Sequence, residues 1–119
     1  MIKTKTRRID AEGPLQRACV DHLRARFPGA IVHHSANERI GARAGARARN
    51  LGQVAGFPDI ITIMPDGAVV FFEVKAPAGR VSDAQAAFMA RLDALGHRCA
   101  VVRHTSEIDA ALAAWGIAA

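Results

Sequence analysis

Two short runs of β-branched and aromatic residues constrain this chain more than any other feature. Residues 59–64 and 68–75 are almost wholly apolar and carry their few charges towards their outer ends. Pro65, Asp66 and Gly67 lie between the two runs, and this composition is typical of a tight turn. The segment therefore predicts two antiparallel strands joined as a β-hairpin, in a sheet that is covered on both faces.

The register of this hairpin determines which charged side chains meet. If the turn is centred on Asp66, then Asp59 and Glu73 face each other, because each lies seven residues from that centre. Facing residues of an antiparallel pair have Cβ atoms roughly 5 Å apart. Lys75 lies two residues beyond Glu73 and therefore on the same face of its strand. The sequence predicts two carboxylates and one ammonium group at the open end of the hairpin.

This cluster contains the ligand types that a hard divalent cation prefers. Mg²⁺ binds one or two carboxylates and completes its shell with water and substrate phosphate oxygens. Such a cation lowers the pKa of a bound water, and Lys75 can orient or deprotonate that water or stabilise a phosphorane. In the structural alternative, Pro58 and Asp59 form a turn, and Glu73 and Lys75 form a charge pair at a strand end. The matching register favours metal-dependent phosphodiester hydrolysis.

The composition is that of one soluble globular domain covering residues 1–119. Half of the residues are hydrophobic and 23% are charged, which is ordinary for such a domain. No apolar stretch approaches the roughly 18 residues needed to cross a membrane. Residues 1–9 are basic and contain no apolar segment of a signal peptide. We therefore expect a flexible basic tail and a cytoplasmic protein without a membrane partner.

Positive charge is concentrated in the first half of the chain. Residues 1–58 contain 11 Lys and Arg against 4 Asp and Glu, whereas residues 59–119 contain 5 against 7. A basic surface beside a carboxylate cluster suits a polyanion. Residues 35–57 form a long loop without apolar periodicity, and such loops are usually functional or mobile. Four arginines of this loop are expected either to contact phosphates or to form a solvated face: Arg39, Arg43, Arg47 and Arg49.

The remaining segments predict three helices and two more strands. Ser82 and Gln85 form a capping-box signature at the start of one helix, and Gly96 is its expected end. Its apolar positions at helical spacing are Ala84, Phe88, Leu92 and Leu95. The other expected elements are a helix over residues 10–27 with a buried stripe of Leu15, Cys19, Leu23 and Phe27, strands at residues 30–34 and 98–103, and a last helix that begins at Ser106 with Asp109.

The order α-β-β-β-α-β-α, with Pro-Asp opening the second strand and Glu-x-Lys ending the third, resembles the PD-(D/E)XK nuclease superfamily. That resemblance implies an α/β fold with a mixed sheet, built on a restriction-endonuclease-like core. More narrowly, the chain resembles the VRR-NUC family, in particular its small standalone members of phage and bacterial type. The residues that carry this resemblance are Glu12, Gln16, Asn37, Gly56, Phe57, Pro58, Asp59, Glu73, Val74, Lys75, Ser82, Gln85 and Gly96.

The resemblance implies a role for each residue of the cluster. Asp59 and Glu73 are implied as ligands of Mg²⁺ or Mn²⁺, together with the backbone carbonyl of Val74. Lys75 is implied as the catalytic lysine. Glu12 is implied to complete the metal site, directly or through a water; its alternative role is to complement the dipole of its helix.

Two positions outside the hairpin have a competing structural role. Gln85 is implied to reach from the following helix towards the site, whereas its place in the capping box indicates a helix cap instead. Asn37 is implied to act with the arginines on DNA, and its alternative is a turn residue. The chain also departs from the family pattern at Gly13 and Pro14, which affects where the first helix starts and where Glu12 points.

By resemblance, the chain is expected to be a DNA endonuclease that hydrolyses phosphodiester bonds with Mg²⁺ or Mn²⁺. The resemblance further implies a homodimer that acts on branched DNA, a flap or a four-way junction, in a bacterial cell or an infected host cell. Two alternatives stay open. One is a non-catalytic DNA-binding module of the same fold, and the other is a toxin or restriction-type nuclease with the same chemistry.

Overall fold

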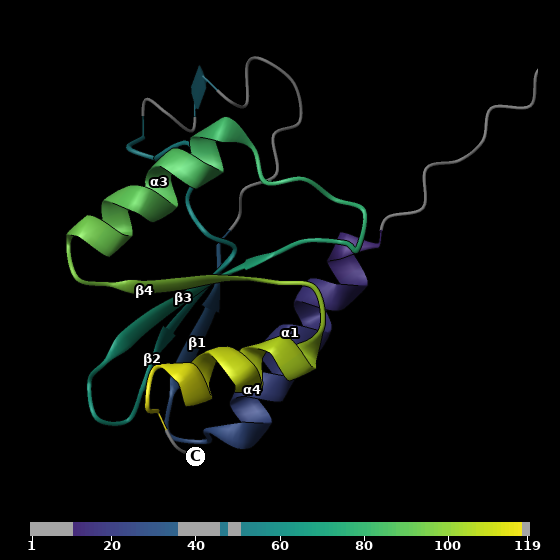
Figure 1. Cartoon of the computed structure of the whole chain (residues 1–119), viewed down its shortest axis with the longest axis vertical. Helices are drawn as coiled ribbons and strands as arrows, with labels where there is room; N and C mark the ends of the chain where they lie inside the picture. Colours follow the sequence, from purple (N-terminus) through teal and green to yellow (C-terminus); the bar gives the residue numbers. More distant parts are fainter. Residues whose placement is uncertain (1–10, 36–45, 48–50, 118–119) are drawn as a thin grey trace, which may run out of the picture.

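A four-stranded mixed sheet forms the centre of the molecule in the computed structural model, which describes residues 11–35, 46–47 and 51–117 (Figure 1). The strands lie side by side in chain order. The first two pairs are antiparallel, and the last pair is parallel. The strands are β1 (Ile31–His34), β2 (Ile60–Ile63), β3 (Val69–Val74) and β4 (Arg98–Val102).

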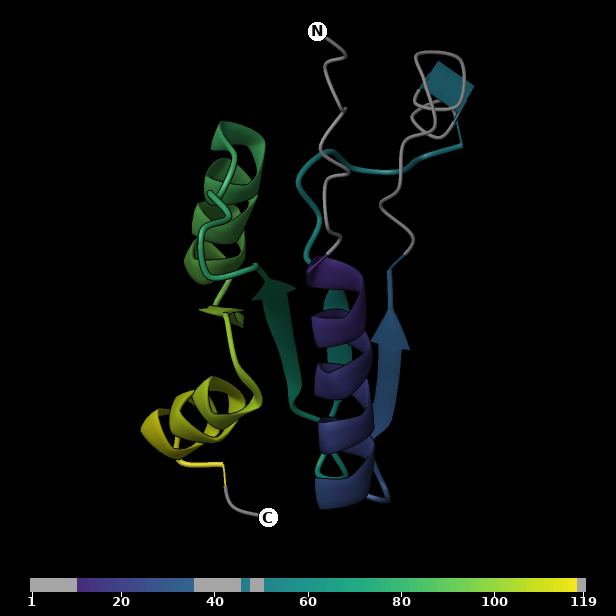
Figure 2. The same ribbon diagram turned by 90° about the vertical axis from the view of Figure 1, so that its right-hand side faces the viewer.

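Three helices pack against this sheet, namely α1 (Glu12–Arg26), α3 (Asp83–Ala94) and α4 (Thr105–Ala114). Helix α1 runs alongside β1, and α1 and α3 lie on opposite sides of β3 (Figure 2). Together with the strands, these helices confirm the predicted order α-β-β-β-α-β-α and the mixed α/β fold. No helix in the described part of the chain is both long enough and apolar enough to span a bilayer.

The hairpin has the predicted register. Ile60 faces Phe72, and Ile63 faces Val69, across the β2–β3 ladder. At the turn, the Asp66 carboxylate accepts a hydrogen bond from the backbone N–H of Ala68, with a distance of 3.0 Å. Gly67 takes a φ of +93°, a conformation that a residue without a Cβ adopts without strain. The turn chemistry therefore centres the hairpin where the sequence indicated.

The main hydrophobic core lies between α1, α4 and one face of the sheet. It contains Leu23, Phe72 and Leu112, each essentially inaccessible to solvent. The predicted stripe of α1 is confirmed, since Cys19, Leu23 and Phe27 are buried and Leu15 packs against them. Side chains alternate between faces along a strand, so the neighbours of these core residues point to the opposite face, towards α3.

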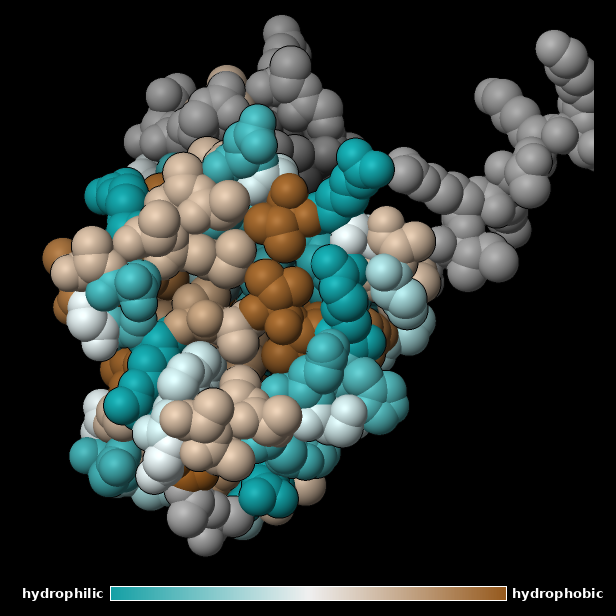
Figure 3. Space-filling view, in the orientation of Figure 1, coloured by the Kyte–Doolittle hydropathy of each residue, from teal (hydrophilic) through white to brown (hydrophobic). Residues whose placement is uncertain are grey.

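Strand β4 is covered less completely than the inner strands. Apolar side chains reach the surface between α3 and α4 (Figure 3), where β4 crosses the molecule in the same view (Figure 1). Only Val102 of this strand is fully buried, and Cys99 to Val101 are half-buried. The apolar run from Cys99 nevertheless forms a strand as predicted, because it pairs with β3 along its whole length.

Gly96 ends α3 as predicted, whereas the burial of Leu95 and the start of α4 differ from the prediction. Helix α3 ends at Ala94 with Leu95 as its C-cap, and the chain turns at Gly96, with a φ of +84°, into β4. Leu95, which was expected among the apolar positions of the helix, is 73% exposed. Helix α4 begins at Thr105 rather than Ser106, with His104 as its N-cap. The His104 ring nitrogen Nδ1 accepts a hydrogen bond from the Ser106 backbone N–H at 3.1 Å. Histidine is an uncommon N-cap residue, so the usual capping rules point to the serine instead.

Candidate active site

Asp59 and Glu73 lie opposite each other at the end of the hairpin. The ladder that pairs Ile60 with Phe72 puts them in register one step further on. The Asp59 carbonyl accepts a hydrogen bond from the backbone N–H of Ser35 at 2.7 Å, so the backbone groups of Asp59 point towards β1. The Asp59–Glu73 pair is therefore non-hydrogen-bonded, which is the arrangement that brings cross-strand side chains closest.

The Asp59 carboxylate is held by the neighbouring strand. Its Oδ2 accepts a hydrogen bond from the backbone N–H of Val74 at 2.8 Å. The N–H and C=O groups of a strand residue point to the same side, so the Val74 carbonyl is also on the Asp59 side of β3. Two carboxylates and one backbone carbonyl, all possible oxygen ligands of a cation, therefore lie at the same end of the hairpin.

The Glu73 side chain is only 1% exposed, and its two oxygens have different surroundings. Oε1 accepts a hydrogen bond from Gln85 Nε2 at 2.7 Å and lies 3.8 Å from Lys75 Nζ. Oε2 is buried and has no hydrogen-bond partner among the described residues. A buried carboxylate oxygen without a donor costs free energy unless a cation or another donor meets it.

The charge on this cluster perturbs the Glu73 carboxyl group. Burial, followed by the nearby charge of Asp59, raises the pKa of Glu73 to about 8, although the Lys75 ammonium opposes this shift. Two carboxylates at close quarters disfavour each other's ionised forms, and a divalent cation between them reverses that effect. The donor set, the burial and the orphaned Oε2 atom therefore fit a hard divalent cation such as Mg²⁺.

Gln85 satisfies both of the roles that its sequence position allows. Its Oε1 accepts from the Ser82 backbone N–H at 2.9 Å, and the Ser82 hydroxyl accepts from the Gln85 backbone N–H at 3.1 Å. This confirms the capping box. At the same time, the other end of the amide donates to Glu73. A side-chain amide can do both because its acceptor and its donors lie on different atoms.

Glu12 lies near the site, but the structure does not join it to the two hairpin acids. A Cβ placed on Gly79 would be 3.2 Å from Glu12 Oε1, so the carboxylate lies against the loop that follows β3. Within the described ranges, no three His, Cys, Asp or Glu side chains are grouped closely enough to hold one ion. Helix α1 starts at Glu12 and directs its carboxylate to that loop, so direct coordination by Glu12 is not supported; a contact through water stays a prediction.

The family model of the VRR-NUC domain matches residues 5–105 of this chain. The chain belongs to the VRR-NUC nuclease family. A solved structure titled "VRR_NUC domain" is 23% identical, with a TM-score of 0.61, over 82% of this chain and 89% of that one. A second, titled "VRR_NUC domain protein", is 18% identical with a TM-score of 0.68, over 91% and 89%. These two likenesses show the fold. Among curated proteins, none matches the chain.

In this VRR-NUC domain, Arg103 binds the loop that follows β3 and Lys75. Its Nη1 donates to the carbonyls of Ala76 at 2.6 Å and Gly79 at 2.7 Å. The loop therefore has a fixed path between the lysine and the position where Glu12 approaches it. Sequence reasoning missed this residue, because a basic residue at the end of β4 matches no local motif.

The structure explains why the Gly-Phe-Pro-Asp segment of this VRR-NUC domain begins with a glycine, Gly56. Its φ is +77°, and a Cβ there would lie 2.3 Å from the Ala84 carbonyl oxygen in the first turn of α3. Only glycine permits this approach of the two backbones. The next residue, Phe57, packs against Phe88 of α3 and Phe71 of β3, with ring centroids 5.2 Å and 6.0 Å apart. The segment thus fixes the strand that carries Asp59 against the helix that carries Gln85.

Of the residues predicted to contact DNA, the structure describes only Arg47. Arg47 is exposed in a short helical segment, and its carbonyl accepts a hydrogen bond from the Leu51 backbone N–H at 3.0 Å. The other four predicted contacts lie outside the described residues, and their role stays a prediction: Asn37, Arg39, Arg43 and Arg49.

Proposed function

We propose that this VRR-NUC domain is an endonuclease that hydrolyses phosphodiester bonds in DNA with Mg²⁺ or Mn²⁺. The observation that carries the proposal is the pair of buried carboxylates, Asp59 and Glu73, with the Oε2 atom of Glu73 lacking a hydrogen-bond partner in the described part of the chain. Membership of a nuclease family supports the reaction class. Hard cations bind oxygen ligands of this kind.

The residues that would hold the cation are Asp59, Glu73 and the carbonyl of Val74, with Glu12 acting through a water. When bound, the ion would lower the pKa of a water and offset negative charge on the phosphate. The chain itself orients the ligands. The Val74 N–H holds Asp59 Oδ2, and the Gln85 amide holds Glu73 Oε1, which leaves Oε2 as the oxygen that would bind the ion.

Lys75 supplies the cationic group of the site. It is 8% exposed, and its Nζ is 3.8 Å from Glu73 Oε1, so it is positioned beside the ligands rather than in solvent. A buried ammonium there can donate a hydrogen bond to the attacking water or to a non-bridging phosphate oxygen. Because the lysine opposes the raised pKa of Glu73, it also favours the ionised form of that ligand.

The substrate we propose is branched DNA, either a flap or a four-way junction, cut by a homodimer. Family resemblance supports this part of the proposal. The concentration of Lys and Arg in residues 1–58 supports a polyanionic substrate. Sedimentation of the purified protein tests the dimer, and a monomer that cleaves branched DNA efficiently contradicts it.

One experiment tests the reaction and the substrate together. The purified protein is incubated with labelled linear, flap and four-way DNA in Mg²⁺, in Mn²⁺ and in EDTA. We expect cleavage only with a divalent ion, and faster cleavage of branched DNA than of linear DNA. Cleavage in EDTA contradicts the metal-dependent mechanism. DNA binding without cleavage under every metal condition indicates the non-catalytic binding module instead.

A further inference from the structure

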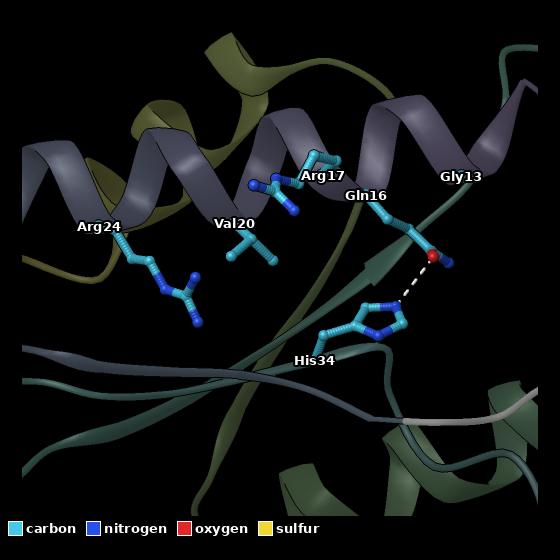
Figure 4. A pocket seen from close by; sticks show the side chains of 6 residues that line it. All are labelled: Gly13, Gln16, Arg17, Val20, Arg24 and His34. Carbon is cyan, nitrogen blue, oxygen red and sulfur yellow. Dashed lines mark hydrogen bonds between the residues drawn. The ribbon is translucent and has the colours of Figure 1, made fainter.

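A second polar pocket lies between α1 and the edge strand β1. It encloses about 270 Å³, and none of its lining residues is acidic (Figure 4). His34 is paired with Ile60, the residue next to Asp59, so its side chain points to the face of the sheet opposite the Asp59 carboxylate. The lining residues are Gly13, Gln16, Arg17, Val20, Arg24 and His34.

Hydrogen-bond donors in this pocket exceed the acceptors that surround them. Arg24 Nη2 donates to the Val32 carbonyl at 3.0 Å, and the rest of its guanidinium has no acceptor in the described part of the chain. His34 Nε2 donates to Gln16 Oε1 at 2.9 Å, so the amide nitrogen of Gln16 remains for another acceptor (Figure 4). An arginine fork with unused donors suits an oxyanion such as a phosphate.

Arg17 adds a second guanidinium at the rim. Its Nε forms a 3.2 Å ion pair with Asp21, and both side chains are largely exposed. Exposed pairs of this kind are weak, so the Asp21 carboxylate does not prevent Arg17 from meeting an anion. The pocket volume is several times the roughly 30 Å³ that one water occupies in the liquid. A phosphate group therefore fits, with bridging waters beside it.

At one end of the pocket, both walls approach the candidate active site. On the helix side, Gly13 follows Glu12, whose carboxylate lies against the loop after β3. On the strand side, His34 precedes Ser35, whose N–H donates to the Asp59 carbonyl. A nucleic-acid strand that passes round this end of the sheet would thus meet the pocket next to the hairpin acids.

We propose that the pocket formed by Gln16, Arg17, Arg24 and His34 binds a backbone phosphate of the DNA strand, distinct from the phosphate that is hydrolysed. The inference rests on the proposed function, because it takes DNA as the substrate. In the competing explanation, the bonds from Arg24 to Val32 and from His34 to Gln16 only attach the edge strand to α1. Arg24 and His34 are exposed, so the donors of Arg24 that meet no acceptor in the described part of the chain are open to an incoming phosphate.

The test uses the salt dependence of DNA binding. Affinity for a short duplex is measured in EDTA at salt concentrations of about 50 to 200 mM. The plot of log K against log salt has a negative slope, and each lost phosphate contact makes that slope less steep by about 0.9. We expect Arg24→Gln to weaken binding and to reduce the slope by about 0.9. The matched control is Arg98→Gln, which also removes one charge and one side-chain bond to a carbonyl, that of Trp115 at 2.9 Å.

Arg98 lies at the start of β4, the opposite end of the sheet from the hairpin acids, so Arg98→Gln should leave the slope unchanged. An unchanged slope in folded Arg24→Gln overturns the proposal. If Arg24→Gln lowers the melting temperature strongly, the double variant Arg17→Gln/His34→Gln keeps the Arg24–Val32 bond and must reduce the slope instead. An unchanged slope there overturns the proposal as well.

Failure of this inference differs from failure of the proposed function. If the wild-type protein cleaves DNA with Mg²⁺ and the variant slopes match the wild type, the pocket proposal alone is wrong. If the wild-type protein never cleaves DNA but Arg24→Gln reduces the slope, the pocket proposal holds and the nuclease proposal is wrong.

Discussion

The two faces of the β2–β3 hairpin carry opposite kinds of side chain within one residue of each other. On the face towards α1 and α4, Ile60 and Phe72 are apolar and fully buried. On the face towards α3, Asp59, Glu73 and Lys75 are charged and more than nine-tenths buried. Burying a large apolar side chain stabilises the fold by roughly 1.5–3 kcal/mol, whereas burying a charge costs free energy unless it is paired. One face therefore stabilises the fold, and the other holds groups that stability alone does not require.

The largest expected effect is on the apolar face. Phe72→Ala should lower the free energy of unfolding by about 3–5 kcal/mol, because it leaves a cavity beside Trp115, whose ring lies 5.8 Å from the Phe72 ring. Urea denaturation measures this loss. The control is Ile63→Ala at a partly exposed position of the same hairpin, and an equal loss in both variants would contradict the division between the two faces.

On the charged face, Asp59→Asn should remove activity and leave the fold intact. We expect at least a roughly hundredfold loss of cleavage rate, because a ligand of the proposed cation is removed, while the free energy of unfolding should not fall. Cleavage assays and thermal melts are run in parallel. Asp66→Asn at the exposed turn is the matched control and should cleave like the wild type; near-normal activity of Asp59→Asn would sink the proposed site.

Gln85 links the charged face to α3, and its two roles can be separated. Gln85→Ala removes the side-chain half of the capping box and the hydrogen bond to Glu73, and we expect metal affinity to fall about 10- to 100-fold, as for residues that orient a ligand. Ser82→Ala removes only the hydroxyl that caps the Gln85 backbone N–H, and it should cost about 1 kcal/mol of stability with metal affinity unchanged. Calorimetric titration with Mn²⁺ measures the affinities, and equal affinities in the two variants would refute a ligand-orienting role for Gln85.

The most gradual effect is a pH dependence of the metal-free protein, because it is spread over several pH units. Folding raises the pKa of Glu73 from an ordinary 4.5 to about 8, so between these values the folded state holds a proton that the unfolded chain has lost. The free energy of unfolding should therefore fall as pH rises through this window, by on the order of 1 kcal/mol per pH unit. Glu73→Gln should flatten this dependence in EDTA. An identical pH profile for both proteins would show that Glu73 is not the titrating group.

Local patterns were sufficient for much of the fold. The hairpin register followed from the turn residues around Asp66 and the two-residue period of a strand, and the capping box followed from Ser82 and Gln85. The start of α4 was predicted less well, because this helix has an uncommon N-cap residue, His104. Leu95 kept helical spacing in the sequence but is the exposed C-cap of α3, just before the chain turns at Gly96 into β4.

The sequence by itself determined the strand pairing that sets Asp59 opposite Glu73, because turn chemistry and side-chain alternation act over a few residues. Only the tertiary structure decided that β1 takes the backbone groups of Asp59, that Gln85 meets Glu73, and that the Glu12 carboxylate lies at the loop after β3. It also decided that α1 and β1 enclose a basic pocket. These contacts depend on how elements far apart in the chain pack together, and no local pattern specifies those packing distances.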